Sequence, residues 1–233
     1  MSRAVSDRFP LRSFTSVLFL VLASVIIGVA APSSSGLELL QLGLISASLL
    51  FALEHSGLRA HLRRLVLSVT VLAIVVAVVG ALAGSDDVAT LISSSMGVAI
   101  ALAACILIFQ GIRRTTITVD IQTVAAVLSI YLFIGVGFAA VYGVIDALSD
   151  TSIFASQSSA DTSDRMYFAF ITLATVGYGD LTPATRLMRA AAVGTAIIGQ
   201  IYLVSIVAVV VSNLGRRSRM APPEVDQGES STP

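Results

Sequence analysis

The chain has 233 residues, of which 56% are hydrophobic and only 12% charged, and its acidic and basic side chains balance to no net charge at pH 7. A soluble domain carries about 25% charged residues, and several apolar runs here approach or exceed the roughly 18 residues that cross a bilayer. The composition excludes a water-soluble globular protein and gives no reason to expect a nucleic-acid partner.

The N-terminal half contains four apolar segments, which we interpret as transmembrane helices. They cover residues 14–31, 37–53, 65–84 and 88–110. We assign residues 1–13 to a basic cytoplasmic N-terminus and residues 14–117 to one four-helix transmembrane domain. The first segment also fits a cleavable signal peptide, because a basic start, a short apolar stretch and small residues at its end describe both. We favour a retained helix. The single cysteine, Cys105, allows no disulfide within the chain and is interpreted as a core residue.

Residues 118–214 form a second predicted unit. Its expected elements are an apolar helix at 121–145, a polar stretch at 146–164, a short helix at 165–174, a Gly-rich loop at 175–180 and a long apolar helix at 185–214. The short helix cannot cross a membrane, so we expect it to enter and turn back, because irregular backbone survives at membrane depth only inside protein or beside water. Residues 215–233 are predicted to be a disordered cytoplasmic tail. The fold class is all-α integral membrane, with six transmembrane helices plus a re-entrant helix and loop.

Arginine placement predicts the orientation of these spans. With six spans and both termini in the cytoplasm, eleven of the fourteen arginines lie on the cytoplasmic side. Such an excess is typical of cytoplasmic loops. The exceptions, Arg165, Arg186 and Arg189, flank the loop at 175–180. We therefore expect this loop at the extracellular mouth of a multi-pass protein of the cell membrane.

The loop at 175–180 reads Thr-Val-Gly-Tyr-Gly-Asp. Aiming successive carbonyls at one axis needs backbone angles that most L-residues avoid, and Gly177 and Gly179 adopt them at low cost. The Thr175 hydroxyl adds an oxygen at the inner end, and the Val and Tyr side chains are expected to point away from the axis. Stacked rings of such oxygens replace the water shell of a dehydrated cation.

This string and its setting resemble the tetrameric potassium channels over Asp120–Asn213, roughly two-fifths of the chain. The resemblance implies an outer helix, a turret (146–164), a pore helix, a selectivity filter and an inner helix, in the order given above. Because the chain has one filter string, a ring of four needs four chains; a homotetramer is expected, and a mixed tetramer is the alternative. The implied ion-binding residues are Thr175, Val176, Gly177, Tyr178 and Gly179, with K⁺ held at the first four.

Other residues are implied to support the filter. Asp180 is expected behind the filter at the outer mouth, bonded to Tyr167, and Tyr167 and Phe168 are expected to brace the filter from the pore helix. Gly199 matches the family's inner-helix hinge glycine. Two positions depart from the family pattern: Ala174 replaces a threonine of many members, and Ile171 replaces a glutamate of some, which removes one route to filter inactivation.

One face of the last helix carries residues spaced by three and four positions, namely Gln200, Leu203, Val207 and Val211. Our hypothesis is that this face lines the cavity, with Val207 and Val211 forming an apolar constriction that closes by dewetting. The alternative is that these residues pack against neighbouring helices.

The fourth segment argues against conventional voltage gating. A voltage sensor carries arginines through its fourth helix, because several charges must cross the field to supply the work of opening. Residues 88–110 carry none, and Arg113 and Arg114 lie at the cytoplasmic boundary, where the orientation rule already explains them.

The leading interpretation is a passive potassium channel with no covalent chemistry, no cofactor besides the permeant ion, and membrane lipids and further copies of the chain as partners. No nucleophile–base pair or phosphate-binding loop suggests an enzyme. Two alternatives stay open: a subunit of a potassium uptake system, and a non-conducting or regulatory subunit. An intact single filter favours the channel over both.

Overall fold

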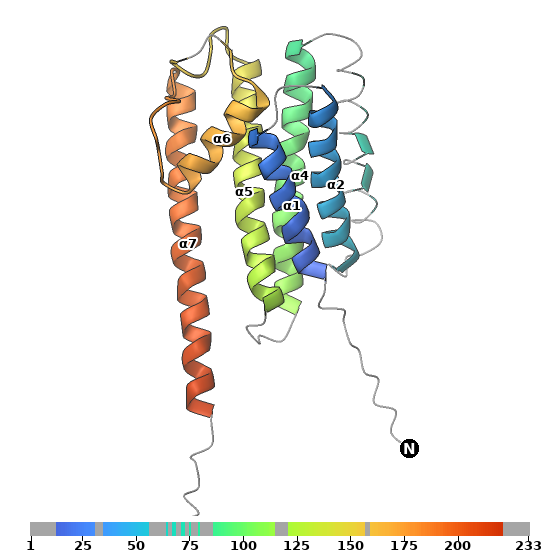
Figure 1. Ribbon diagram of the computed structural model, residues 1–233, viewed down its shortest axis with the longest axis vertical. Coiled ribbons are helices and arrows are strands. Elements are labelled where there is room, and N and C mark those ends of the chain that lie inside the picture. The colour runs from blue at the N-terminus through green and yellow to red at the C-terminus, as the bar shows by residue number, and fades with distance from the viewer. Residues whose placement is uncertain are drawn as a thin grey trace, which may run out of the picture.

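The structure is a computed structural model that describes residues 13–30, 35–55, 86–114, 121–156 and 159–220, with isolated helical positions between 64 and 79. Its helices are α1 (Ser13–Ala30), α2 (Ser35–His55), α4 (Asp86–Arg114), α5 (Ile121–Ala147), α6 (Thr162–Leu173) and α7 (Arg186–Met220) (Figure 1). Most of the predicted N-terminus and third segment, and the tail beyond Met220, lie outside the described residues. Within them the chain is all-helical apart from one isolated bridge between Phe154 and Pro183.

Three of these helices are long and apolar enough to cross a membrane. The qualifying stretches are Leu91–Gln110, Gln122–Ala147 and Arg186–Ile206. Two shorter apolar stretches lie in α1 and α2, at Phe14–Ala30 and Gly43–Ala52. The described chain therefore has the architecture of a helical membrane protein, and the count of six spans stays a prediction.

Two predicted boundaries are wrong. The short helix begins at Thr162, three residues before the predicted start. The last helix continues to Met220, so residues 215–220 are helical rather than part of a disordered tail. Three arginines in this extension, Arg216, Arg217 and Arg219, explain the difference. Arginine has high helix propensity, and its charge interacts favourably with the negative end of the helix dipole.

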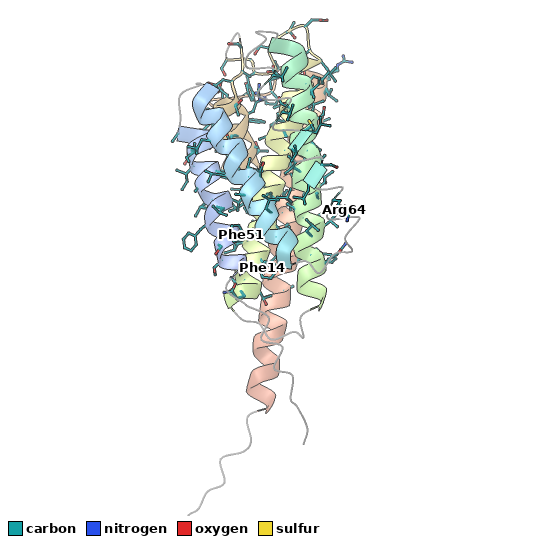
Figure 2. The ribbon with its side chains drawn as sticks, turned by 90° about the vertical axis from the view of Figure 1, so that its right-hand side faces the viewer. Phe14, Phe51 and Arg64 are labelled. Atoms are coloured by element: carbon teal, nitrogen blue, oxygen red, sulfur yellow. The ribbon has the colours of Figure 1, made fainter. Side chains whose placement is uncertain are left out.

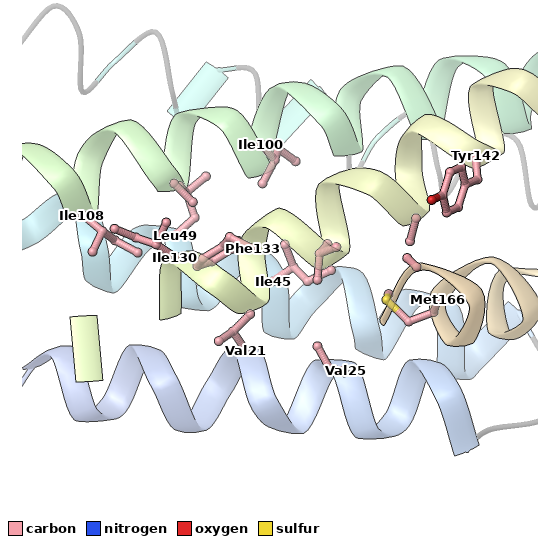
Figure 3. Close-up of a cluster of buried hydrophobic side chains, with 14 of the residues drawn as sticks. Val21, Val25, Ile45, Leu49, Ile100, Ile108, Ile130, Phe133, Tyr142 and Met166 are labelled. Carbon is pink, nitrogen blue, oxygen red and sulfur yellow. The ribbon is translucent and has the colours of Figure 1, made fainter. Parts of the chain in front are cut away.

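Helices α1, α2, α4 and α5 lie side by side as a bundle, and α7 stands on the far side of α5 (Figure 1). The short α6 runs obliquely between α5 and α7 near one end of the molecule. Buried side chains from five helices meet between these elements, including Val21, Ile45, Ile100, Phe133 and Met166 (Figure 3). One continuous core thus joins α6 to the bundle.

Small residues let α4 and α5 pack closely. A Cβ added to Gly97 would lie 3.1 Å from the Cβ of Ala140, and one added to Gly137 would lie 3.1 Å from the Cβ of Ala101. Small residues on facing helices allow such close backbone approach in membrane proteins. Farther along, the Cys105 thiol lies 3.9 Å from the Ile130 carbonyl, which is consistent with its interpretation as a core residue.

Helix α1 is fastened to the second half of the chain at both of its ends. The Thr15 N–H donates to Gln122 Oε1 of α5 at 3.3 Å, and Ser163 Oγ of α6 donates to the Val29 carbonyl at 2.8 Å. The N-terminal helices therefore pack on the α5–α6 unit of their own chain.

Large apolar side chains cover the outside of this bundle. Phe51 of α2 is 43% exposed (Figure 2). Phe19, Ile26, Leu102, Ile106 and Phe109 are likewise exposed. A soluble protein rarely exposes apolar surface on this scale, whereas a lipid bilayer covers it without cost.

Candidate functional site

Helix α6 is placed by its N-terminus. The Asp164 N–H donates to Asp161 Oδ1 at 2.7 Å, and the Asp161 N–H donates back to Asp164 Oδ2 at 3.2 Å, which makes a reciprocal capping box. The box satisfies N–H groups that a helix start leaves free. Aspartates at positions 161 and 164 are the sequence signal that sets the true start of this helix.

Arg165 ties the first turn of α6 to the end of α5. Its Nη1 donates to Asp146 Oδ2 at 2.9 Å and to the Ala160 carbonyl at 3.1 Å, and its Nη2 donates to Thr162 Oγ1 at 3.0 Å. The side chains of Arg165 and Asp146 are only 11% and 21% exposed. Sequence reasoning treated Arg165 as an exception to the orientation rule and missed this role.

The loop at 175–180, here called the filter loop, follows the C-terminal end of α6. The Thr175 N–H donates to the Thr172 carbonyl at 3.0 Å. The N–H groups of Val176 and Gly177 both donate to the Ile171 carbonyl, at 2.8 and 3.2 Å. Three successive amide groups therefore point back at the helix.

The carbonyls of the filter loop consequently point the opposite way. No described peptide bond is cis, so each N–H points away from the carbonyl of the preceding residue. The carbonyls of residues 174–176 must then face away from α6. Within the described chain, none of the carbonyls of residues 174–179 accepts a hydrogen bond. They are free to coordinate a cation.

Backbone handedness alternates along the filter loop. Thr175, Gly177 and Gly179 have φ of 57°, 53° and 85°, while no residue between them has positive φ. This alternation gathers N–H groups on one side and leaves the carbonyls on the other. Gly177 and Gly179 thus have the positive φ that glycine adopts at low cost. Positive φ at Thr175 was not predicted, because it is costly for a β-branched residue and is imposed here by the bonds to α6.

Tyr167 supports the filter loop as the resemblance implies. Its hydroxyl donates to Asp180 Oδ2 at 2.7 Å. The bond raises the pKa of Tyr167 to about 12 and lowers the pKa of Asp180. Phe168, in contrast, is buried against Tyr142 of α5 and Phe154 of the turret, with ring centroids 5.4 and 5.1 Å away. It therefore seats α6 in the core.

The chain leaving the filter loop is pinned to the turret. The Ala155 N–H donates to the Thr182 carbonyl at 2.9 Å, and the Ala184 N–H donates to the Ile153 carbonyl at 2.8 Å. Ile153 is fully buried. These bonds fix the exit of the filter loop as the capping box fixes the start of α6.

Gly199 lies where α7 touches the end of α6. A Cβ at this position would overlap the Leu173 carbonyl oxygen and approach its side chain to 2.9 Å. The predicted hinge glycine is therefore also a contact that any side chain would disturb. Gly135 of α5 plays a similar part that the sequence did not reveal, because an added Cβ would lie 2.5 Å from the ring of Phe170.

The predicted cavity face of α7 is only partly described. Gln200 and Leu203 are exposed in the single chain, on the helix beside the filter loop. Val207 and Val211 lie on α7, but their side chains are outside the described part. The apolar constriction stays a prediction.

A sequence model of the ion channel family matches residues 126–216. This segment belongs to an ion channel family. The ion channel segment begins within α5, contains α6 and the whole filter loop, and ends within α7. Searches of curated proteins and of solved structures gave no significant match. The family match indicates a membrane-embedded channel rather than an enzyme.

Proposed function

We propose that the protein is a potassium-selective channel that conducts K⁺ passively across the cell membrane as a homotetramer. The observation that carries this is the backbone of the filter loop. Its carbonyls are turned away from α6 and unbonded within the described chain, and its alternating φ values orient them to one side. Rings of such oxygens, one from each chain, replace the hydration shell of a cation.

Exposure of the filter side chains supports assembly. Val176 and Tyr178 are 51% and 74% exposed in the single chain. Exposed apolar residues also recur on α7 at spacings of three to four, at Val193, Ile197, Ile201 and Val204. Other copies of the chain would cover these surfaces. The proposed ion sites lie at Thr175, Val176, Gly177 and Tyr178, with the termini in the cytoplasm and the filter loop at the extracellular mouth.

The dipole of helix α6 also favours the binding of a cation at the proposed filter. Its C-terminal end precedes the filter loop directly, and the C-terminal end of a helix carries partial negative charge from its aligned peptide dipoles. Four such ends around one axis would favour a cation at the inner end of the filter.

Potassium flux from liposomes containing the purified full chain tests the proposal, with sodium as the comparison ion. We expect flux of K⁺ and almost none of Na⁺. Equal flux of the two ions would contradict a selective filter, and absence of flux under all conditions would favour the regulatory-subunit alternative.

Two glycine variants provide a matched comparison for this assay. A Cβ at Gly177 or at Gly194 would meet no atom within 4 Å in the single chain, so the positions differ chiefly in backbone, with φ of 53° at Gly177 alone. Gly177→Ala should abolish selective flux, because alanine resists the left-handed conformation by about 1 kcal/mol or more. Gly194→Ala should conduct normally.

A further inference from the structure

A cavity of about 730 Å³ lies between the N-terminal helices and the ion channel segment, at the filter end of the molecule. Its walls come from α2, α4, α5, the turret and the first turn of α6. One side is apolar, formed by residues such as Ile45, Val136 and Met166, and the other is lined by hydroxyls and charged groups. Its volume lies in the range of small-molecule sites.

A glutamine amide lines this cavity without a hydrogen bond to the described chain. Gln41 of α2 is only 7% exposed, lines the cavity and packs against Gly28 of α1, where an added Cβ would lie 2.5 Å from Gln41 Nε2. Its side chain makes no hydrogen bond within the described chain. Among the described residues, Ser24 Oγ is the side-chain polar atom that is both fully enclosed and unbonded, so the Gln41 amide is reached by the water of the cavity. A polar ligand group in the cavity would take the place of that water.

The charged groups that line the cavity determine whether it favours a cationic or an anionic ligand. Asp146, Asp150 and Asp161 line the cavity against one cation, Arg165. The Arg165 guanidinium is already bonded to Asp146, Ala160 and Thr162, which leaves it poorly placed to bind an anion. The positive end of α6 is likewise occupied by the carboxylates of its capping box. Asp150 is exposed and has no ion pair within the described residues.

We propose that this cavity binds a small organic cation, an ammonium group on an apolar body. The ammonium group is held by the Asp150 carboxylate, the Gln41 amide oxygen accepts a hydrogen bond from the ligand, and the apolar body packs against the wall that contains Ile45 and Val136. The site is separate from the filter loop, so its occupancy does not depend on the ion that the channel conducts.

Fluorescence of the full chain tests this site without any measurement of conduction. The sequence contains no tryptophan, so Thr151→Trp at the exposed rim of the cavity gives a single reporter. The probe is phenethylamine, which is protonated at neutral pH, compared with neutral 2-phenylethanol and anionic 3-phenylpropionate. We expect a saturable emission change with phenethylamine at concentrations where the other two compounds give none.

Variants made in the reporter background locate the bound probe. Gln41→Leu and Asp150→Asn should each raise the Kd for phenethylamine about tenfold, the size of one lost hydrogen bond to a charged group. Gln110→Leu, near the other end of α4 and away from the cavity, should leave the Kd unchanged. All variants are first checked for elution at the position of the parent protein.

Three results would overturn the proposal. These are the absence of saturable binding, equal binding of the three compounds, and binding that Gln41→Leu and Asp150→Asn leave unchanged. The last result would place the amine elsewhere, for example in the pore. None of them bears on potassium selectivity, which the flux assay decides separately.

Discussion

Tyr167 and Asp180 make a bond whose dependence on pH can be worked out from its two pKa shifts. The folded-state pKa of Asp180 is lowered below its ordinary value of 3.8, so the bond contributes fully above that value and is lost as pH falls through the lower one. The pKa of Tyr167 is raised from 10.0 to about 12, so on the alkaline side the contribution is complete below 10.0 and is lost as pH rises toward 12.

Tyr167→Phe should therefore move the loss of filter function in acid to a higher pH. Without the phenol, the pKa of Asp180 returns toward 3.8, and its carboxylate becomes protonated at a higher pH than in the parent. Potassium flux measured against external pH should begin to fall at a higher pH in the variant. Tyr131→Phe is the control, because the Tyr131 hydroxyl makes no hydrogen bond within the described residues and its ring packs on Tyr202. Parallel pH profiles for parent and Tyr167→Phe would contradict the expectation.

A comparison of two variants distinguishes whether Gly199 serves as a hinge or as a packing contact. Gly199→Ala should lower thermal stability, by about 1–3 kcal/mol for an overpacked position, because the new methyl group overlaps the Leu173 carbonyl. Gly194→Ala, on the same helix with open space around it, should lack that penalty. Thermal unfolding in detergent distinguishes them. Equal stability of the two variants would contradict the packing role of Gly199 and leave its hinge role as the remaining prediction.

The residues of the filter loop could be predicted because their chemistry is local. Gly177 and Gly179 adopt the positive φ that their identity permits. Thr175 does so against its preference, and only the bonds from residues 175–177 to the end of α6 account for it. The contact of Gly199 with Leu173 joins two helices and has no signature in either one. Such contacts require the packed structure.

At the scale of elements, α6 is held at its start by a charged pair and at its end by the filter loop. Removing one partner of a partly buried pair leaves the other charge without its partner in a place that water reaches poorly. The pair of Arg165 and Asp146 therefore matters more than an exposed ion pair would.

Arg165→Gln should destabilise the protein by about 2 kcal/mol, the value of a hydrogen bond to a charged group. Asp146→Asn should cost a similar amount, and the double variant should cost less than the two single effects combined, because the residues interact directly. Chemical unfolding followed by circular dichroism measures each. Arg186→Gln is the control, since Arg186 is exposed on the first turn of α7. Strict additivity would show that the pair does not act as a unit.

Element types were easier to predict than element boundaries. The long apolar runs gave α1, α2, α4, α5 and α7 within a few residues at most ends. The start of α6 was misplaced because apolar content begins at Met166, whereas the capping box that starts the helix is made of two aspartates. The end of α7 was misplaced because charged residues after an apolar run were taken to end the helix as well as the span.

At the scale of the whole molecule, α4 is the described helix that directly precedes α5 in the chain, and it lacks the charges of a voltage-sensing helix. It runs from Asp86 to Arg114, and its arginines are the last two residues. Moving one elementary charge through 100 mV supplies about 2.3 kcal/mol, and steep gating needs several such charges. Helix α4 carries none in its apolar stretch, Leu91–Gln110.

Open probability should therefore vary only weakly with membrane voltage. Recordings from the protein in planar bilayers with symmetric potassium would measure this directly, over both polarities. An exponential rise of open probability with voltage, as steep as several gating charges would produce, would show that the field acts on charges outside α4.

Light scattering on the same preparation should give a protein mass about four times the 24.2 kDa of the chain if the tetramer forms.

The connection from α4 to α5 also bears on how the protein is made. Helix α4 ends at Arg114 and α5 begins at Ile121, and the six residues between them reach at most about 20 Å. A nascent chain leaving the ribosome can therefore bury its first helices against its own α5 and α6 as soon as these are inserted, without waiting for a sister chain. Each protomer would then have its N-terminal helices docked in the bilayer before it met another copy, and only the inner surfaces would remain to be joined during biogenesis.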